Sequence, residues 1–299
     1  GRFNPDQRTG GVESFARSLK LAFEDVKFLD ARSDGPGSAA MQQVVTNGLP
    51  VVCDNHLVMD WPDGYPVIGF QHGVAAEKRL ITWSRTDWLL ARMQARAARR
   101  QATIWVACAR WISDEFSKRY GNQAHRIIYH AVDTNLFDGR LVNRDSKLVL
   151  HDGRSRHKGR ELYPILQDAL PDWTFEPLDC SPAQVPERMR GACAFMHLSR
   201  YEGSSIVCNE AMAMGLPCLF TRVGLMRDAE PLDVSIIEVR QAYGRRKRLI
   251  ECVSSFLEGL NEVSYRPRDW IVQHTSQQAF IASWRNVLAG WRHMKQNGV

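Results

Sequence analysis

The sequence predicts an α/β protein built from two parallel-sheet domains. Short apolar runs recur along its 299 residues and alternate with amphipathic helical stretches, as is typical of parallel strands covered by helices on both faces. A polar stretch near residues 138–145 interrupts the alternation once, after which it resumes. A chain of this length is sufficient for two ordinary domains. We therefore expect two Rossmann-like domains, with the ligand site in the cleft between them, beyond the carboxyl ends of the strands.

Each of the two series contains several strand candidates. In the first series they are VKFLD from Val26, LPVVCD from Leu49, PVIGF from Pro66, TIWVAC from Thr103 and RIIYH from Arg126. In the second series they are KLVLHD, WTFEPL, CAFMHLS, PCLFT and VSIIEV, between residues 147 and 239. Helix candidates lie between the strands, for example at 12–23, 160–170 and 243–260. We divide the chain into a first domain over 1–140, a second over 141–275 and a closing helix over 276–299.

Composition excludes several classes of protein. Apolar residues make up 44% of the chain and charged residues 24%, and no apolar run approaches the roughly 18 residues that span a bilayer. The seven cysteines include no C-x-x-C pair, and the nine histidines show no metal-ligand spacing. Buried, reduced thiols in a cytoplasmic protein are therefore favoured over a disulfide framework or a zinc site.

The positive charge is concentrated in one region. The net charge is +6, and eleven basic residues face four acidic ones between Ala76 and Arg126. Within that region RTDWLLARMQARAARRQ predicts a helix with Trp88, Leu89 and Met93 as buried anchors and arginines on the opposite face. This face is either simply solvated or meets an anionic partner, such as lipid headgroups at the inner face of the cytoplasmic membrane or a phosphorylated substrate. No nucleic-acid binding motif accompanies it, so nucleic acid is not expected. The arginines are Arg85, Arg92, Arg96, Arg99 and Arg100.

The segment SRYEGSSIVCNEAMAMGLPCLF, residues 199–220, carries the strongest chemical signal. It follows a strand, and its helix should begin at Ile206 and stop at Gly215. Glu202 then lies at the carboxyl end of the strand, and Glu210 follows one to two helical turns later. A carboxylate can accept hydrogen bonds from two neighbouring sugar hydroxyls. Backbone N–H groups at a helix N-terminus stabilise a phosphate, and here they would come from Gly203, Ser204 and Ser205.

This segment resembles the E-x7-E signature of retaining GT-B-fold glycosyltransferases of the family-4 type, which use nucleotide-sugar donors. Other parts of the family pattern follow in the same order. They are TGGVESFARSL at Thr9, FQHG at Phe70, HAVDTNLF at His130 and DGRSRHKGRELYPIL at Asp152. The resemblance extends from Thr9 to about Gly224 and implies a GT-B architecture of two Rossmann-like domains, the first for the acceptor and the second for the donor.

The resemblance also implies roles for individual residues. Arg154 and Lys158 would neutralise the donor diphosphate and the charge on the departing nucleotide. Glu210 would bind the ribose hydroxyls, Glu202 the hydroxyls of the transferred sugar, and His72 would border that sugar. In the family, a closing helix crosses back to the first domain. The glycine loop over the donor phosphates would be Gly10 and Gly11, where a Cβ would obstruct the approach.

The resemblance implies a sugar transfer that retains the anomeric configuration. No metal ion is expected, because no Asp-x-Asp element lies in a metal-binding context. We expect a glycan, lipid-linked or lipopolysaccharide-type acceptor. Four departures qualify the pattern. Ser204-Ser205 replaces the usual Phe-Gly, and the spacing from Arg154 to Lys158 is one residue shorter than expected. TFEPLDCSP lacks the Gly-x-Gly that commonly contacts the base, and no strand pattern precedes Thr9, so that the first domain is reduced or begins late. The alternatives are an inactive GT-B-like nucleotide-sugar binding subunit, a GT-B epimerase or phosphorylase, and an anionic-polymer binder.

Overall fold

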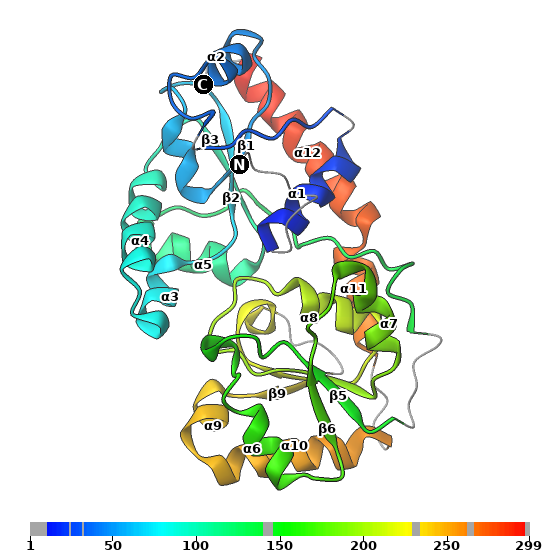
Figure 1. The fold of residues 1–299 in the computed structure, drawn as a ribbon. Helices are drawn as coiled ribbons and strands as arrows, with labels where there is room; N and C mark the ends of the chain where they lie inside the picture. The colour runs from blue at the N-terminus through cyan, green and yellow to red at the C-terminus, as the bar shows by residue number, and fades with distance from the viewer. Residues whose placement is uncertain are drawn as a thin grey trace. The chain divides into compact units, whose positions relative to one another are not determined.

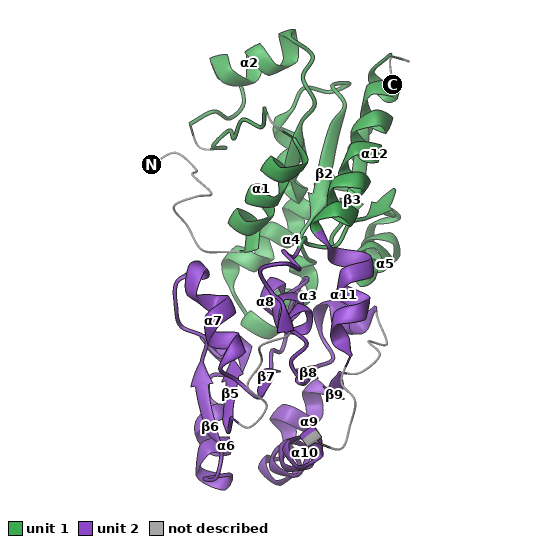
Figure 2. Cartoon of the chain, turned by 90° about the vertical axis from the view of Figure 1, so that its right-hand side faces the viewer, with its two compact units in different colours: residues 1–131, 277–299 green, residues 132–276 purple. Residues whose placement is uncertain are grey.

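The computed structural model describes residues 11–23, 25–31, 33–139, 146–228, 234–261 and 266–296 (Figure 1). The chain forms two compact units, coloured separately in Figure 2. Unit 1 contains residues 1–131 and 277–299, and unit 2 contains residues 132–276. The chain therefore passes from unit 1 to unit 2 at 131–132 and back at 276–277, whereas the sequence pattern predicts these divisions at 140–141 and 275–276.

Unit 1 is built on a parallel sheet with the strand order β1-β2-β3-β4. The strands are β1 (Val52–Asp54), β2 (Val67–Gln71), β3 (Thr103–Ala107) and β4 (Arg126–Ile127). Every residue of β2 is buried, because this central strand is covered on both faces, and its sequence is correspondingly apolar. The helices are α1 (Gly11–Ala22), α2 (Ala39–Thr46), η1 (Asn55–Asp60), α3 (Ala75–Thr82), α4 (Arg85–Ala97), α5 (Arg110–Tyr120) and α12 (Gln277–Gln296).

The strand predicted at VKFLD is wrong, since residues 26–30 form no strand. Leu29 instead packs against the buried cluster around Met41 and Trp61. The backbone of Asp30 is used in a local turn, in which it accepts hydrogen bonds from Ser33 and Asp34. The apolar side chain is thus partly buried without a neighbouring strand, and an apolar run alone cannot distinguish these two outcomes.

Unit 2 contains a parallel sheet with the order β6-β5-β7-β8-β9. The strands are β5 (Leu148–His151), β6 (Thr174–Pro177), β7 (Ala194–His197), β8 (Cys218–Thr221) and β9 (Ser235–Ile237), which match the five predicted ones. The α-helices are α6 (Tyr163–Ala169), α7 (Val185–Arg190), α8 (Ile206–Ala213), α9 (Val239–Gly244), α10 (Arg246–Glu258) and α11 (Pro267–Thr275). Short 3₁₀ turns occur at η3 (Arg156–Lys158), η4 (Pro182–Gln184), η5 (Gly224–Arg227) and η6 (Gly259–Asn261). The helix predicted over 243–260 is divided, because Arg245 has an extended backbone between α9 and α10.

The closing helix α12 packs on α1 within unit 1. It buries Phe280, Trp284 and Trp291, as its helical spacing predicted, while Leu288 is half-buried. Trp284 lies 5.7 Å from Phe15 of α1, measured between ring centroids. Aromatic packing of this kind stabilises the contact between the two ends of the chain.

The prediction that Trp88 and Leu89 are buried anchors of α4 is wrong, whereas the third predicted anchor, Met93, is half-buried. Trp88 and Leu89 are exposed, whereas the helix buries Ala91 and Ala97 together with Asp87 and Gln94. Small side chains allow close contact with α3 and η1, and the two polar groups have partners. Asp87 accepts a hydrogen bond from the Thr82 hydroxyl at 2.6 Å and pairs with Lys78 at 3.1 Å. Gln94 accepts from the amide of Ala75 at 2.9 Å and donates to the carbonyl of Gly73 at 3.1 Å.

Arg100 also differs from its predicted place on the exposed basic face. Its guanidinium donates to the carbonyls of Pro62 and Tyr65 at 2.9 and 2.8 Å, and to the carbonyls of Gln101 and Ala102. These bonds connect two loops of unit 1, so Arg100 has a structural role. Within the described part of the chain, no helix combines the length and the apolar character that crossing a membrane requires.

Candidate functional site

The strand order of unit 2 marks where a ligand site is expected. The sheet begins with β5 in its interior, continues to β6 on one side and then to β7 on the other. In doubly wound sheets, the connections diverge at such a switch point and leave a crevice at the carboxyl ends of the two strands. Two polar segments emerge there, residues 152–158 after β5 and residues 198–205 after β7.

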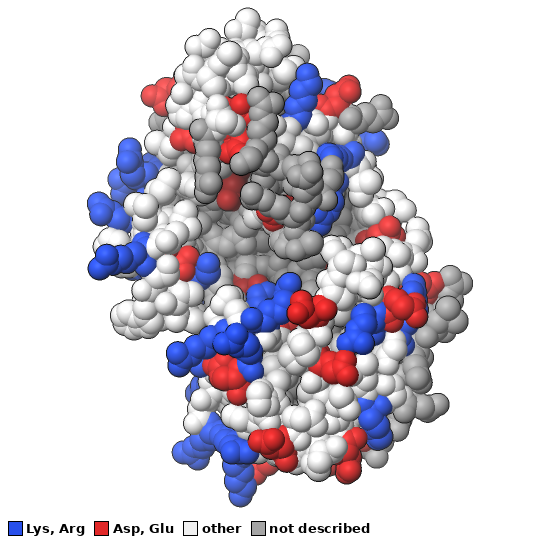
Figure 3. All heavy atoms as spheres, viewed as in Figure 1, with Lys and Arg blue, Asp and Glu red and all other residues white. Residues whose placement is uncertain are grey.

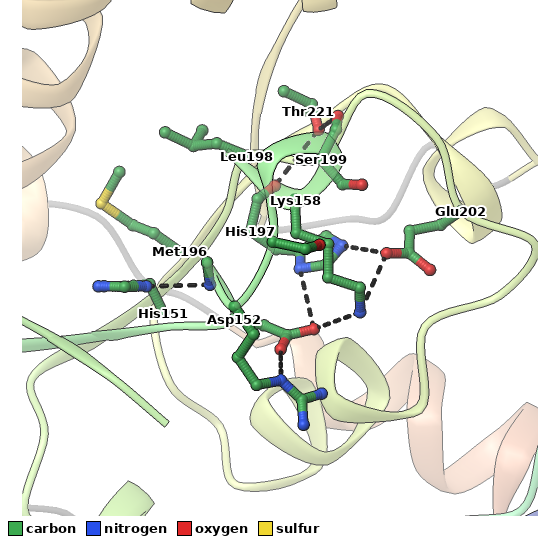
Figure 4. Close-up of polar contacts among 12 residues, drawn as sticks. His151, Asp152, Lys158, Met196, His197, Leu198, Ser199, Glu202 and Thr221 are labelled. Atoms are coloured by element: carbon green, nitrogen blue, oxygen red, sulfur yellow. Dashed lines mark hydrogen bonds and ion pairs between the residues drawn. The ribbon is translucent and has the colours of Figure 1, made fainter. Parts of the chain in front are cut away.

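Asp152 organises the first of these segments. The residue is 1% exposed, and its carboxylate accepts hydrogen bonds from Arg154 Nε at 2.6 Å and from Lys158 Nζ at 2.7 Å. Figure 4 shows Asp152 beside Lys158 and His197. Burial alone would raise its pKa, but His197, Lys158 and Arg154 together lower it below the usual value. Because a buried carboxylate is destabilising unless it is paired, Asp152 stays ionised and holds both cationic side chains in place.

Glu202 lies in the second segment and connects to the first. Its Oε1 is 3.3 Å from Lys158 Nζ and 3.2 Å from His197 Nε2. Burial would raise its pKa, but His197 and Lys158 outweigh that effect and lower the pKa to about 2. The carboxylate predicted to bind a sugar is therefore ionised and shared between two cationic groups.

His197, the last residue of β7, completes the network. The side chain is 2% exposed, and its Nδ1 lies 3.8 Å from Asp152 Oδ2. Burial alone would lower its pKa, but Cys208 and Glu202 raise it to about 10. Neither Asp152 nor His197 was assigned a role from sequence. Asp152 is only the first residue of the DGRSRHKG segment, and His197 is a single polar residue in an apolar run. The available signal was that each of them stands at the end of a predicted strand.

Two glycines allow the segments to approach closely. Gly159 has φ +80°, and a Cβ there would be 2.6 Å from the carbonyl oxygen of Leu198. Gly224, at φ +58°, faces the Cβ of Glu202, to which an added Cβ would be 3.0 Å. Any other residue would be strained at these φ values and would displace the loop that carries Glu202.

The helix after the second segment agrees with the sequence prediction. Helix α8 begins at Ile206, and Gly215 follows it with φ +70°. Ser205 is its N-cap residue, and the buried Ser204 hydroxyl has no hydrogen-bond partner among the described residues. Glu210 lies half-buried on α8, and Gly203 precedes the two serines. The first turn of α8 therefore starts beside the network that contains Glu202.

The network can bind an anion. Arg154, Lys158 and a protonated His197 carry three positive charges, whereas Asp152 and Glu202 carry two negative charges. The Arg154 side chain is 54% exposed, and only its Nε contacts Asp152 among the described atoms. The outer nitrogens of this guanidinium are suited to a phosphate group. Among the described residues, no group of three or more His, Cys, Asp and Glu side chains is arranged to hold a metal ion.

Residues 145–235 match the family model for glycosyl transferases group 1. This matched segment contains the whole network, the loop after β7 and helix α8. No curated protein matches the chain.

Solved structures give a wider comparison of the fold. Sucrose-phosphate synthase from Thermosynechococcus elongatus aligns with a TM-score of 0.67 at 13% identity, over 96% of this chain and 82% of that one. HepE from Anabaena, in complex with UDP, aligns with a TM-score of 0.69 at 15% identity, over 95% of this chain and 97% of that one. WaaG aligns with a TM-score of 0.50 at 15% identity, over 78% of this chain and 79% of that one. The chain therefore has the GT-B glycosyltransferase fold, with two Rossmann-like domains.

The remaining predicted site residues lie in unit 1, outside the segment that matches the glycosyl transferases group 1 model. His72 follows β2, and its ring contacts Phe70 and Phe15 at centroid distances of 4.5 and 4.9 Å and stacks on His130 at 5.7 Å. Burial lowers the pKa of His72 to about 3, so the ring is neutral. Gly11 is the first residue of α1, and no described atom lies within 4 Å of a Cβ built on it. Gly10 lies outside the described residues.

Proposed function

We propose that the protein is a retaining glycosyltransferase that moves a sugar from a nucleoside-diphosphate sugar to a glycan, lipid-linked or lipopolysaccharide-type acceptor. The observation that carries the proposal is the network at the ends of β5 and β7. There Arg154 and Lys158 pair with Asp152, and Lys158 also meets Glu202 next to the start of α8. It lies wholly within the segment that matches the glycosyl transferases group 1 model.

In this proposal, different residues at the site bind different parts of the donor. The diphosphate binds to Arg154 and Lys158 and to the backbone N–H groups at Gly203, Ser204 and Ser205. Glu210 accepts hydrogen bonds from the ribose hydroxyls, and Glu202 accepts them from the transferred sugar. As Lys158 turns its charge toward the phosphates, its contact with Glu202 at 3.3 Å weakens, which leaves that carboxylate available to the sugar.

The same cations serve the chemical step. As the bond between the sugar and the diphosphate breaks, negative charge grows on the departing phosphate, and Arg154 and Lys158 stabilise it in place of a metal ion. The departing phosphate then accepts the proton of the attacking acceptor hydroxyl on the same face, so the anomeric configuration is retained. His72, whose pKa burial holds low enough to keep the ring neutral, hydrogen-bonds to the transferred sugar.

The first donor class to test is a uridine diphosphate sugar. HepE has been crystallised with UDP, with UDP and glucose, and with UDP-glucose. WaaG is described as a glycosyltransferase involved in lipopolysaccharide biosynthesis, which supports a glycan acceptor of that general kind.

Calorimetric titration of UDP, GDP, ADP and dTDP into the protein and into Glu210→Ala tests the donor site. A hydrogen bond to a charged group contributes about 1.5–3 kcal/mol, so the substitution should weaken the preferred nucleotide about ten- to hundredfold. Glu187→Ala is the matched control, because this glutamate is 81% exposed on α7 of the same unit, and it should leave binding unchanged.

Turnover is followed by NMR of the anomeric proton in donor and product. Consumption of the donor only when acceptor is present, with an unchanged anomeric configuration, supports a retaining transferase. A nucleotide that binds but is never consumed indicates a binding subunit, and conversion of the donor without acceptor indicates an epimerase. If none of the four nucleotides binds, the proposal is wrong.

A further inference from the structure

The α3–α4 hairpin of unit 1 presents large apolar side chains to solvent. Trp83 connects the two helices in a left-handed conformation with φ 54°, and its side chain is 87% exposed. Leu80, on the last turns of α3, is also more than half exposed. A bulky residue at positive φ is strained, so the fold holds an indole outward at a conformational cost.

Helix α4 continues this exposed surface. Trp88 and Leu89 are both more than half exposed, and they share a helical face with Arg85 and Arg92 because the four positions have i, i+3, i+4 and i+7 spacing. Arg79 and Arg92 lie over the Trp88 ring at 5.3 and 5.9 Å. Trp83, Ser84, Arg85, Trp88, Leu89 and Arg92 together line a shallow depression. We call the surface made by these six residues and Leu80 the hairpin tip.

Folding of the hairpin does not explain why these side chains are exposed. Apart from the packing of Arg79 on Trp88, the contacts described above between α3 and α4 are on the opposite face. They join Asp87 to Lys78 and Thr82, and Gln94 to the start of α3. The apolar residues of the tip could therefore be polar without loss of these contacts. Contiguous exposed apolar surface of this kind marks a site of interaction.

The charges around the tip indicate which partner it fits. Arg85, Arg92 and Arg96 on α4, and Arg99 just after its C-terminus, are exposed. Within the described ranges no acidic side chain forms an ion pair with any of them. Figure 3 shows Lys and Arg side chains gathered over this edge of unit 1. Tryptophan and leucine surrounded by arginines suit the interface of a bilayer, where indoles lie at headgroup level and arginines contact lipid phosphates.

We propose that the hairpin tip binds the surface of an anionic lipid bilayer. Leu80, Trp83 and Leu89 enter the interfacial layer, and Arg85, Arg92 and Arg96 contact the phosphates of the headgroups. The surface lies entirely in unit 1, and the inference does not depend on the proposed sugar transfer.

Co-sedimentation of the full chain with vesicles tests the proposal. Vesicles of phosphatidylcholine alone are compared with vesicles that also contain phosphatidylglycerol, using the wild type, Trp83→Asp and Arg92→Ala/Arg96→Ala. Aspartate tolerates the left-handed conformation at position 83, so the first variant should fold. Loss of an indole that enters the bilayer should weaken binding to the vesicles at least about tenfold. Loss of two arginines should weaken it about 25-fold, at about fivefold each.

The chain offers a matched control for charge. Arg246 and Lys247 are exposed at the start of α10 in unit 2, and no large exposed apolar side chain lies beside them in α10. Arg246→Ala/Lys247→Ala removes the same charge and should change vesicle binding less than twofold. Brominated lipids provide a second measurement, because they quench the fluorescence of tryptophans inside the bilayer, and Trp83→Phe should reduce this quenching while preserving sedimentation.

The proposal is overturned if the wild type does not sediment with the phosphatidylglycerol vesicles, or sediments equally with phosphatidylcholine alone. It is also overturned if Trp83→Asp binds as the wild type does, or if the α10 control loses as much binding as the α4 variant. Sedimentation that requires anionic lipid, Trp83 and the α4 arginines, with the control intact, supports it.

Discussion

Replacement of Glu202 by Gln should destabilise unit 2 by about 3 kcal/mol at pH 7. The pKa of Glu202 falls from 4.5 to about 2 in the folded chain, and each tenfold change in proton affinity corresponds to about 1.4 kcal/mol. The pKa of His197, on the other side of the same contact, rises from 6.5 to about 10, which gives about 5 kcal/mol by the same conversion. We use the smaller figure, because part of the effect on the pKa of His197 comes from Cys208.

The stabilisation that Glu202 contributes should decrease at acidic pH. The folded-state pKa of Glu202 lies below the unfolded value, so its stabilisation is present above pH 4.5 and is lost as the pH falls from 4.5 toward 2. About 2 of the 3 kcal/mol should therefore be lost by pH 3. The difference between the wild type and Glu202→Gln, measured by urea denaturation with circular dichroism, should shrink over that range.

Glu187→Gln on α7 is the control for the loss of one carboxylate. Glu187 forms an exposed pair with Arg190 at 3.0 Å, and such pairs contribute about 0–1 kcal/mol. If Glu202→Gln proves as stable as the wild type at pH 7, or if its deficit does not change between pH 6 and pH 3, Glu202 is not paired with Lys158 and His197 in the unliganded protein.

Three further outcomes follow from the structure. Trp284→Ala should lower the stability of unit 1 by about 3–5 kcal/mol in denaturant titration, because the side chain is fully buried; Trp284→Phe should lose much less, and equal losses would contradict this reasoning. Gly159→Ala should lower the thermal midpoint and weaken nucleotide binding, because its Cβ would meet a carbonyl at 2.6 Å; an unchanged midpoint would show that the loop adjusts freely. His72 and His130, whose pKa values burial lowers to about 3, should show no titration by NMR between pH 5 and 8. Because their folded-state pKa values lie below 6.5, unit 1 should lose stability as the pH falls from 6.5 toward 3, and a titration midpoint near 6.5 would contradict their burial.

Much of unit 2 could be predicted from the sequence. The alternation of strands and helices predicted all five strands, and the segment from Arg200 to Gly215 predicted a loop followed by α8. These features depend on local properties, namely apolar periodicity and the preference of glycine for positive φ. The proximity of Lys158 to Glu202 agrees with the motifs that suggested both residues, although their roles in donor binding remain predictions.

Other features were decided only by tertiary structure. Asp152 meets His197, and Lys158 meets Glu202, because β5 and β7 are neighbours in the sheet. No local sequence pattern specifies the order of strands in a sheet. The errors at VKFLD and in α4 also arise from contacts between segments that are distant in the sequence. Whether Leu29 joins a sheet, or whether Trp88 faces inward, depends on which surfaces meet it, and Arg100 became structural because the carbonyls of two loops converge on it. The sequence by itself determined the elements and most of the chemical groups, whereas packing determined which of those groups meet and which remain exposed.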